Sequence, residues 1–303
     1  MIITPTSDTR LTVRVGCLLR YTAASDTPLL LNLRPAEEPR QVVQQEKLVI
    51  GDNLPSEEFT DSHGNHIHRV LLRPGPTEIR HDALVSVWAS ADPHDHAGGE
   101  QTPIAALPPQ FLRYTLPSRY CDSDRLLNFA WEKFREFPPG GQRVQAICNW
   151  VHSNIEYRFG SGRPDISASE VIARGYGVCR DFSHVVVALC RTLNIPARYA
   201  TGHLPDIGWV DPGSPMDFHA YVQAFLGGCW CAYDARYNAP RIGRIRLACG
   251  LDAVDGAFST IYGAADLTYF DVWAYQVRAG SVALGDPVDL TRRLDGSLEV
   301  TAG

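Results

Sequence analysis

The sequence has few of the features that mark membrane proteins or nucleic-acid-binding proteins. No run of about 18 apolar residues occurs, so we predict no membrane-spanning helix. Residues 1–8 contain no basic stretch followed by a long apolar core, so no secretory signal is expected. Lys plus Arg number 28 and Asp plus Glu number 34, which gives a net charge of −6. Without a basic excess to neutralise phosphates, we expect neither a nucleic acid nor a membrane as a partner.

The chain also lacks a cysteine framework. Its eight cysteines are scattered along 303 residues. A chain of that length does not need disulfide staples, so we predict reduced thiols in a cytoplasmic protein. Cys229 and Cys231 enclose one residue and have no second matching pair, unlike the ligands of a structural zinc site. Cys148 and Cys190 lie in apolar helical stretches and are expected in the core.

Signals for bound metal ions are equally weak. No loop has the dense alternating acidic pattern of a calcium site. The segment His94-Asp95-His96 could bind a metal, but a solvated loop without further ligands is the simpler interpretation. We therefore predict a protein with no cofactor and no metal.

The two parts of the chain differ in their patterns. Short alternating or apolar runs, separated by turn-like stretches, predict a β-rich, sandwich-like N-terminal domain over residues 1–115. The expected strands are 11–15, 29–33, 41–43, 47–50, 66–72 and 83–89. Residues 91–109 are rich in Pro, Gly, Asp and His, and are expected to form a linker or long loop. Residues 116–303 form the second predicted domain.

Helical patterns begin in this second domain. Helices are predicted over 123–137, 142–155, a short segment ending at Ala173, and 178–193. Ser167 or Ser169 is the expected cap of the short helix. The last helix is apolar nearly all round, which predicts a buried element. Further strands are expected at 197–201, 219–226, 229–234 and 270–278.

Cys179 lies at the predicted start of the buried helix. A thiol there is close to the positive end of the helix dipole and to unpaired backbone donors, and both favour the reactive thiolate. Gly175 and Gly177 just upstream let the backbone approach the sulfur. A lone cysteine in such a place is more often a small buried hydrophobe. Cys179 therefore needs partners from elsewhere in the chain to act as a nucleophile.

Residues 219–234 contain such partners. Two strand-like runs joined by Gly227-Gly228 predict a hairpin with a two-residue loop. In that register Tyr221 pairs with Asp234, and His219 lies on the same face of the hairpin. His219 and Asp234 are then diagonal neighbours, roughly 7–8 Å apart at the backbone, a gap that a hydrogen bond between their side chains can bridge. A three-residue loop would break this arrangement.

Together these three residues meet the requirements of an activated thiol, in the chain order Cys, His, Asp. The imidazole of His219 takes the proton of the Cys179 thiol. The carboxylate of Asp234 sets the tautomer and the orientation of the ring. We therefore predict a Cys179–His219–Asp234 triad, with a structural His-Asp contact on a sheet edge as the alternative for the last two residues.

Other candidate residues fit less well. Asp181 follows Cys179 by two positions and is off its helix face, so a solvated or capping role is expected. His184 is expected inside the buried helix, whereas His203 ends a strand and could approach the cleft. Three serines lack the context of a nucleophile elbow: Ser153, Ser161 and Ser183.

At these residues the sequence resembles the transglutaminase-like superfamily, which shares the papain-like cysteine-protease fold. The similar segments are 177–184 (GVCRDFSH), 193–199 (LNIPARY), 217–222 (DFHAYV), 230–234 (WCAYD) and 248–255 (ACGLDAVD). The resemblance covers about residues 120–280, and the first 115 residues resemble the N-terminal region of the bacterial branch. It implies an α+β fold in which a central helix carrying the nucleophile packs on an antiparallel sheet, preceded by the β-rich domain.

The resemblance also implies the roles of the site residues. Cys179 is the implied nucleophile, His219 the general base and Asp234 the orienting acid. The backbone N–H of Cys179 and the side chain of Tyr157 are the implied oxyanion donors. The sequence departs from the family in having Tyr221 where Trp is frequent and 235–236 (Ala-Arg) where Pro-Thr is frequent. Both departures could reshape the cleft.

The implied activity is acyl transfer from an amide bond to Cys179. We expect a peptide or protein substrate, and favour hydrolysis of peptide or isopeptide bonds because proteolytic assignments look commoner than cross-linking in the bacterial branch. Transfer to an amine, as in a transglutaminase, is one alternative. A binding module with a vestigial site is the other.

Overall fold

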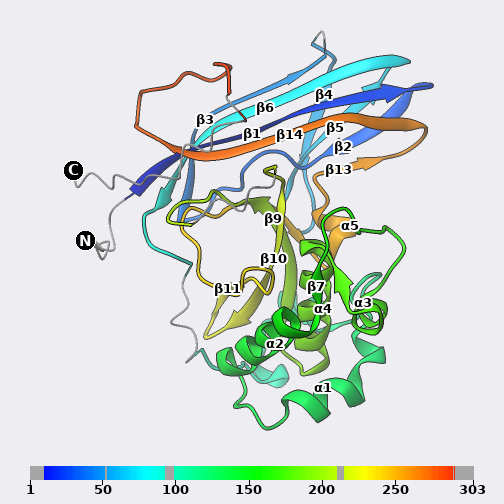
Figure 1. The fold of residues 1–303 in the computed structure, drawn as a ribbon, viewed down its shortest axis with the longest axis vertical. Helices are drawn as coiled ribbons and strands as arrows, with labels where there is room; N and C mark the ends of the chain where they lie inside the picture. The colour runs from blue at the N-terminus through cyan, green and yellow to red at the C-terminus, as the bar shows by residue number, and fades with distance from the viewer. Residues whose placement is uncertain (1–9, 52, 93–98, 210–214, 289, 291–303) are drawn as a thin grey trace.

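The structure is a computed structural model that describes residues 10–51, 53–92, 99–209, 215–288 and 290 (Figure 1). Two antiparallel four-stranded sheets form its β-rich part, with the orders β14-β1-β6-β3 and β13-β2-β5-β4. Their strands are β1 (Arg10–Ala23), β2 (Thr27–Leu31), β3 (Gln41–Ile50), β4 (Ser56–Thr60), β5 (His66–Leu72), β6 (Gly75–Trp88), β13 (Ser259–Ile261) and β14 (Ala265–Val277). Apolar side chains that alternate along these strands fill a shared core, as in a sandwich.

The last two strands return to this sandwich from the far end of the chain. β13 pairs with β2, and β14 pairs with β1 from Ala265 opposite Ala23 to Val277 opposite Thr12. In Figure 1, β14 lies beside β1 in the upper part of the molecule. The boundary at residue 115 stays a prediction, but we assign residues 259–277 to the β-rich part because their backbone hydrogen bonds go to its sheets.

The second part is a mixed α+β unit, as expected. Its sheet has the order β11-β10-β9-β12, all antiparallel, and a short parallel pair joins β7 to β8. These strands are β7 (Glu156–Tyr157), β8 (Tyr176–Gly177), β9 (Ala197–His203), β10 (His219–Leu226), β11 (Cys229–Tyr233) and β12 (Ile245–Gly250). The helices are α1 (Leu127–Phe134), α2 (Gly141–Asn154), α3 (Ala168–Arg174), α4 (Cys179–Thr192) and α5 (Ala253–Gly256), with 3-10 turns η2 (Ile104–Ala106), η3 (Pro109–Thr115) and η4 (Ser123–Arg125).

Helix α4 is the centre of this unit (Figure 1). Every residue from Asp181 to Arg191 is buried, which confirms the prediction of a buried helix. Its apolar side chains pack with those of α2 and with alternate residues of β10, among them Val222 and Ala224, in one core. Such packing holds the start of α4 rigidly against the sheet.

Two predicted helices have different ends. The helix expected over 123–137 is a 3-10 turn, η4, followed by α1, because Leu126 between them leaves the helical region with φ −105° and ψ 8°. For α3, Ser167 rather than Ser169 is the cap. Its backbone N–H donates to Glu170 at 2.7 Å in a capping box.

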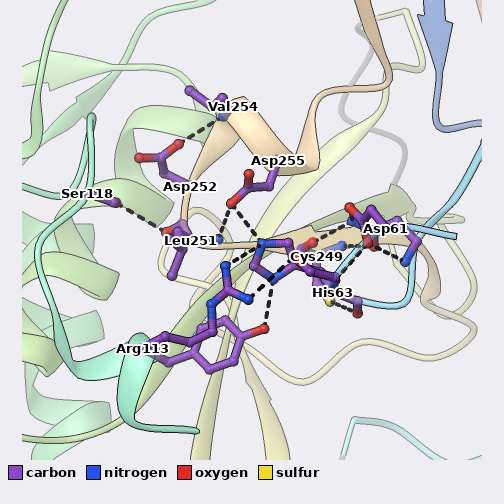
Figure 2. Close-up of polar contacts among 12 residues, drawn as sticks. Asp61, His63, Arg113, Ser118, Cys249, Leu251, Asp252, Val254 and Asp255 are labelled. Carbon is purple, nitrogen blue, oxygen red and sulfur yellow. Dashed lines mark hydrogen bonds and ion pairs between the residues drawn. The ribbon is translucent and has the colours of Figure 1, made fainter. Parts of the chain in front are cut away.

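A polar cluster joins the β-rich part to the end of β12 and to α5 (Figure 2). His63 follows β4. Its Nδ1 is 2.9 Å from the hydroxyl of Tyr114, and its Nε2 is 3.2 Å from Asp255 Oδ2. Asp255 also accepts the backbone N–H of Leu251 at 2.7 Å. A Cβ on Gly250 would lie 2.1 Å from that of Asp255, so only glycine fits there. These contacts fix where α5 begins.

Helix α5 is tied to α4 as well. The backbone N–H of Ala253 donates to Nε2 of His184 at 3.1 Å, and Asp252 caps α5 by accepting the N–H of Val254 at 2.9 Å. His184 therefore lies in the buried helix, as expected, and has a partner there. The arrangement holds α5 beside the N-terminal half of α4.

No helix in the described part of the chain is long and apolar enough to cross a membrane. Among the same residues, no group of three or more His, Cys, Asp and Glu side chains is arranged to hold a metal ion. The segment 94–96, considered above as a possible metal site, lies outside the described residues.

Candidate active site

Cys179 is the first residue of α4 and is half-buried. The start of the helix is built around Asp181, which is fully buried and accepts the backbone N–H of Val178 at 3.1 Å. Arg174 and Arg180 also donate to this carboxylate, at 2.8 and 3.0 Å. Asp181 thus has the capping role expected for it, while a solvated position is wrong. The cap satisfies a free backbone donor and fixes the helix start that carries the thiol.

Gly177 is required by the same cap. A Cβ at this position would lie 2.7 Å from the Cβ of Asp181 and 2.8 Å from its Oδ2, closer than side-chain atoms pack. The segment from Gly177 to Asp181 therefore works as a unit. The glycine makes room for the carboxylate, the carboxylate caps the helix, and the cap holds Cys179 at the helix start.

The hairpin has the register predicted from its two-glycine loop. Leu226 pairs with Cys229 and Val222 with Tyr233, which confirms the prediction. Beyond the last pair, Nε2 of His219 lies 2.7 Å from Oδ2 of Asp234. Because Nε2 faces the carboxylate, Nδ1 is the nitrogen left for Cys179, which lines the same hollow as His219 and helps to raise the pKa of the ring. The fold brings the three predicted residues together.

The charges at this contact favour an imidazolium. Burial disfavours the charged ring, but the charge and hydrogen bond of Asp234, followed by Cys179, outweigh burial and raise the pKa of His219 to about 9. Burial likewise opposes ionisation of Asp234, yet His219 and Arg244 hold the pKa of its carboxyl well below its usual range. A protonated His219 beside a thiol is the state in which the thiolate is stabilised.

Arg244 was not indicated by the sequence. Its Nη2 lies 3.1 Å from the same Oδ2 of Asp234 that His219 contacts. Its guanidinium lies over the ring of Tyr221, with Cζ 4.3 Å from the centroid. Tyr221, one of the two family departures, is thus buried beneath this arginine. No motif spacing signals the contact, because Arg244 precedes β12, a strand missing from the sequence prediction.

Tyr157 lies at the same cleft. It lines two adjoining hollows together with Cys179. The guanidinium of Arg236 stacks on its ring, with Cζ 3.5 Å from the centroid. Arg236 is the other departure from the family pattern, and its backbone N–H donates to Oδ1 of Asp234 at 3.1 Å. The side chain of Tyr157 therefore has a fixed place beside the thiol, as an oxyanion donor requires.

Two of the competing residues, His203 and Ser183, are parts of the core. His203 is buried against Phe218, and burial, followed by the charge of His81, lowers its pKa to about 3. A ring that is neutral and enclosed in this way is a core residue. Ser183 is buried in α4, where its hydroxyl donates to the backbone carbonyl of Cys179 at 2.9 Å.

A cleft of about 760 Å³ opens beside Cys179. Its walls come from the start of α4, β9, β10, α5, the 159–164 loop and the start of β13. Aromatic and aliphatic side chains predominate, among them Tyr120, Phe159, Tyr199, Phe218, Val254 and Phe258. The volume is in the range of sites that enclose small ligands or peptide side chains. Because β13 belongs to the sandwich, the β-rich part contributes to this wall.

Comparison with known proteins agrees with the fold of this unit. Residues 132–235 match the transglutaminase-like superfamily. The structure is similar to that of a "putative cysteine protease" from Cytophaga hutchinsonii, with a TM-score of 0.81 and 29% identity over 90% of this chain and 93% of that chain. An uncharacterised protein of Mycobacterium leprae is 32% identical over 89 residues, 29% of this chain and 32% of that protein. The chain thus matches about a third of the length of this relative.

Proposed function

The chain belongs to the transglutaminase-like superfamily of cysteine enzymes, and we propose that it hydrolyses peptide or isopeptide bonds through a thioester on Cys179. The observation that carries the proposal is that Cys179 and His219 line one hollow, and that His219 is hydrogen-bonded to Asp234. A thiol at a capped helix start, a ring with a raised pKa and a buried carboxylate are what thiol catalysis requires.

The geometry supports a two-step reaction. In the first step the Cys179 thiolate attacks the amide carbonyl and forms a C–S bond. The C–N bond then breaks, and the leaving amine takes its proton from the His219 imidazolium. In the second step water gives a proton to the neutral His219 and attacks the thioester. The acid leaves, and the imidazolium–thiolate pair is restored. Asp234 keeps the ring oriented through both steps.

The negative oxygen that develops on the carbonyl needs donors. The backbone N–H of Cys179, at the first position of α4, is free of an intrahelical partner by its place in the helix. The hydroxyl of Tyr157 is the second donor that we propose, since Arg236 fixes the ring of Tyr157 beside the cleft. Preorganised donors of this kind lower the barrier because they do not reorient during the reaction.

The entering nucleophile distinguishes this proposal from its main alternative, a transamidase. The test incubates the protein with glutamine-containing peptides and with unrelated peptides, with and without a primary amine, and identifies the products by mass spectrometry. We expect free acids as the main products in both conditions. Incorporation of the amine in excess of hydrolysis would favour transamidation instead. No turnover with any peptide, together with a Cys179 as unreactive as a denatured-state thiol, would favour a vestigial binding module.

The cleft predicts a preference for apolar substrates. We expect peptides with a bulky aliphatic or aromatic residue beside the scissile bond to show kcat/KM roughly 10- to 100-fold above matched peptides with Asp there, because burying such a side chain is worth about 1.5–3 kcal/mol. Val254, exposed at the cleft, provides the variant. Val254→Asp should reduce the preference, whereas Val42→Asp, at a surface-exposed position on β3 outside the lining of the cleft, should leave it unchanged. An unaltered preference in Val254→Asp would assign substrate selection to another surface.

The partner we propose is accordingly a peptide or protein substrate. We also propose a cytoplasmic location, supported by the state of the cysteines. All eight are free thiols, and six are buried. Burial raises the pKa of Cys17, Cys121 and Cys190 to about 12, so these thiols are inert core residues rather than disulfide partners. Cell fractionation with an antibody to the protein tests the location.

A further inference from the structure

Asp234 has a second cationic partner besides His219. Its Oδ2 is 2.7 Å from Nε2 of His219 and 3.1 Å from Nη2 of Arg244. Its Oδ1 accepts the backbone N–H groups of Arg236 and Tyr237, at 3.1 and 3.4 Å. Four donors therefore determine the position of one carboxylate. Arg244 is the only one of the four that carries a permanent charge.

Arg244 is in turn held by a residue from the end of the β-rich part. Asp92, just beyond β6, accepts from Nε of Arg244 at 3.0 Å and lies 2.9 Å from its Nη2. The side chains of Arg244, Asp234 and Asp92 are only 5%, 3% and 13% exposed. Charges buried to this extent are weakly screened, so each strongly influences its neighbours.

The result is a row of buried groups with alternating charge. The row runs from Asp92 through Arg244, Asp234 and His219 to Cys179. When the imidazolium–thiolate pair has formed, the two aspartates and the thiolate are negative. Arg244 and His219, which lie between them, are positive. We propose that Arg244, held by Asp92, is a positioning residue that fixes Asp234 and limits the charge that His219 experiences. This inference rests on the proposed function of the triad.

Two consequences follow from this arrangement. Arg244 restrains the rotation of the carboxylate, so the His219 ring keeps the orientation that catalysis needs. Arg244 also partly neutralises Asp234. Without it the full carboxylate charge would act on His219, and the imidazolium would keep its proton to higher pH. The imidazolium would then be a poorer acid for the leaving amine in the first step.

Other titratable or charged groups surround His219 in the described part of the chain. They are Cys179 from α4, Asp217 two residues earlier in the chain, and Tyr237, whose ring centroid is 5.3 Å from that of His219. Tyr157, Asp206 and Arg236 line the same hollow as His219. Substitution of Arg244 or Asp92 changes none of these groups. A change in the pH dependence of such a variant therefore reports on the buried row itself.

The test compares pH profiles of kcat/KM for Arg244→Gln and Asp92→Asn with the wild type. Removing the positive charge should move the alkaline limb, expected near pH 9 from the pKa of His219, upward by about one pH unit. Removing the negative charge of Asp92 leaves Arg244 unopposed, so the limb should move downward. Activity should fall roughly 10- to 100-fold in Arg244→Gln, because the ring loses its orientation. Arg244→Lys, which keeps the charge, should restore the limb to its wild-type position.

The matched control is Arg246→Gln. Arg246 is another mostly buried arginine near the start of β12, paired with Glu38 of the β-rich part, and none of its hydrogen bonds goes to Asp234. It should lose stability without moving the alkaline limb. The inference would be overturned if both Arg244→Gln and Asp92→Asn lost activity equally at every pH and their alkaline limbs did not shift in opposite directions. Arg244 would then have only a structural role.

The two proposals fail in different ways. If wild-type Cys179 is not acylated by any peptide, the proposed function fails. If it is acylated and the pH limbs of the variants do not move, only the role of Arg244 fails. Melting temperatures of all variants show which of them fold. Should Arg244→Gln not fold, the downward shift in Asp92→Asn, which keeps the contact between Arg244 and Asp234, remains decisive.

Discussion

Cys179→Ala is expected to abolish acyl-enzyme formation and to lower kcat by on the order of 10⁵- to 10⁶-fold, as removal of the nucleophile does in a serine protease with a catalytic triad. The physical reason is that, among the residues that the structure describes, no other thiol lines the cleft beside the His219 ring. Turnover of a peptide substrate gives the rate, and intact-protein mass spectrometry detects the thioester.

Cys229 provides the control for this variant, because it is exposed in β11 and hydrogen-bonds to Cys231 rather than to a histidine. Cys229→Ala should retain full activity. In the wild type, iodoacetamide near neutral pH should alkylate Cys179 faster than Cys229, because His219 stabilises the thiolate of Cys179. Residual turnover in Cys179→Ala, or equal alkylation of both thiols, would contradict the assignment.

Asp234→Asn is expected to lower kcat by about 10³- to 10⁴-fold. The amide keeps the shape of the carboxylate but removes the negative charge that raises the pKa of His219. It also leaves the permanent charge of Arg244 next to the ring, 3.1 Å from the atom that replaces Oδ2. Two cations then oppose each other in a buried place, so the loss should exceed that caused by misorientation alone.

The sign of the pH effect follows from the same charges. In the wild type His219 stays protonated until the pH rises through about 9. Without the carboxylate this pKa falls, so the alkaline limb of kcat/KM should move to lower pH in Asp234→Asn. The pH profile and an NMR titration of the ring measure the shift. A limb that stays in place would separate Asp234 from the protonation of His219, and would also remove the basis for the role of Arg244.

Local signals predicted much of the site. The apolar composition of the α4 segment was enough to predict that this helix is buried. The two-residue loop Gly227-Gly228 was enough to predict the register of the hairpin. The capping of α3 by Ser167 is local as well. In each case the partners lie within a few residues of one another, so their spacing in the sequence determines their geometry.

Other elements carried no such signal. All six residues of β12 are buried, so polar and apolar residues do not alternate there, while all five residues of β4 are exposed on an edge strand. β14 could be predicted as a strand, but not that it pairs with β1, some 250 residues earlier in the chain. Strand pairing over that separation depends on which strand of the sandwich still has a free edge when the chain returns to it, and this is decided by the tertiary fold.

The sequence by itself determined the nucleophile candidate, the hairpin that carries His219 and Asp234, and the resemblance to the transglutaminase-like superfamily, because each depends on residues close together in the chain. Only the tertiary structure decided what surrounds Asp234. Arg244 is 10 residues from it and 152 from Asp92, and neither separation corresponds to a helical or strand period. Charges meet at such distances only when packing removes them from water together, and this follows from the whole fold rather than from any segment.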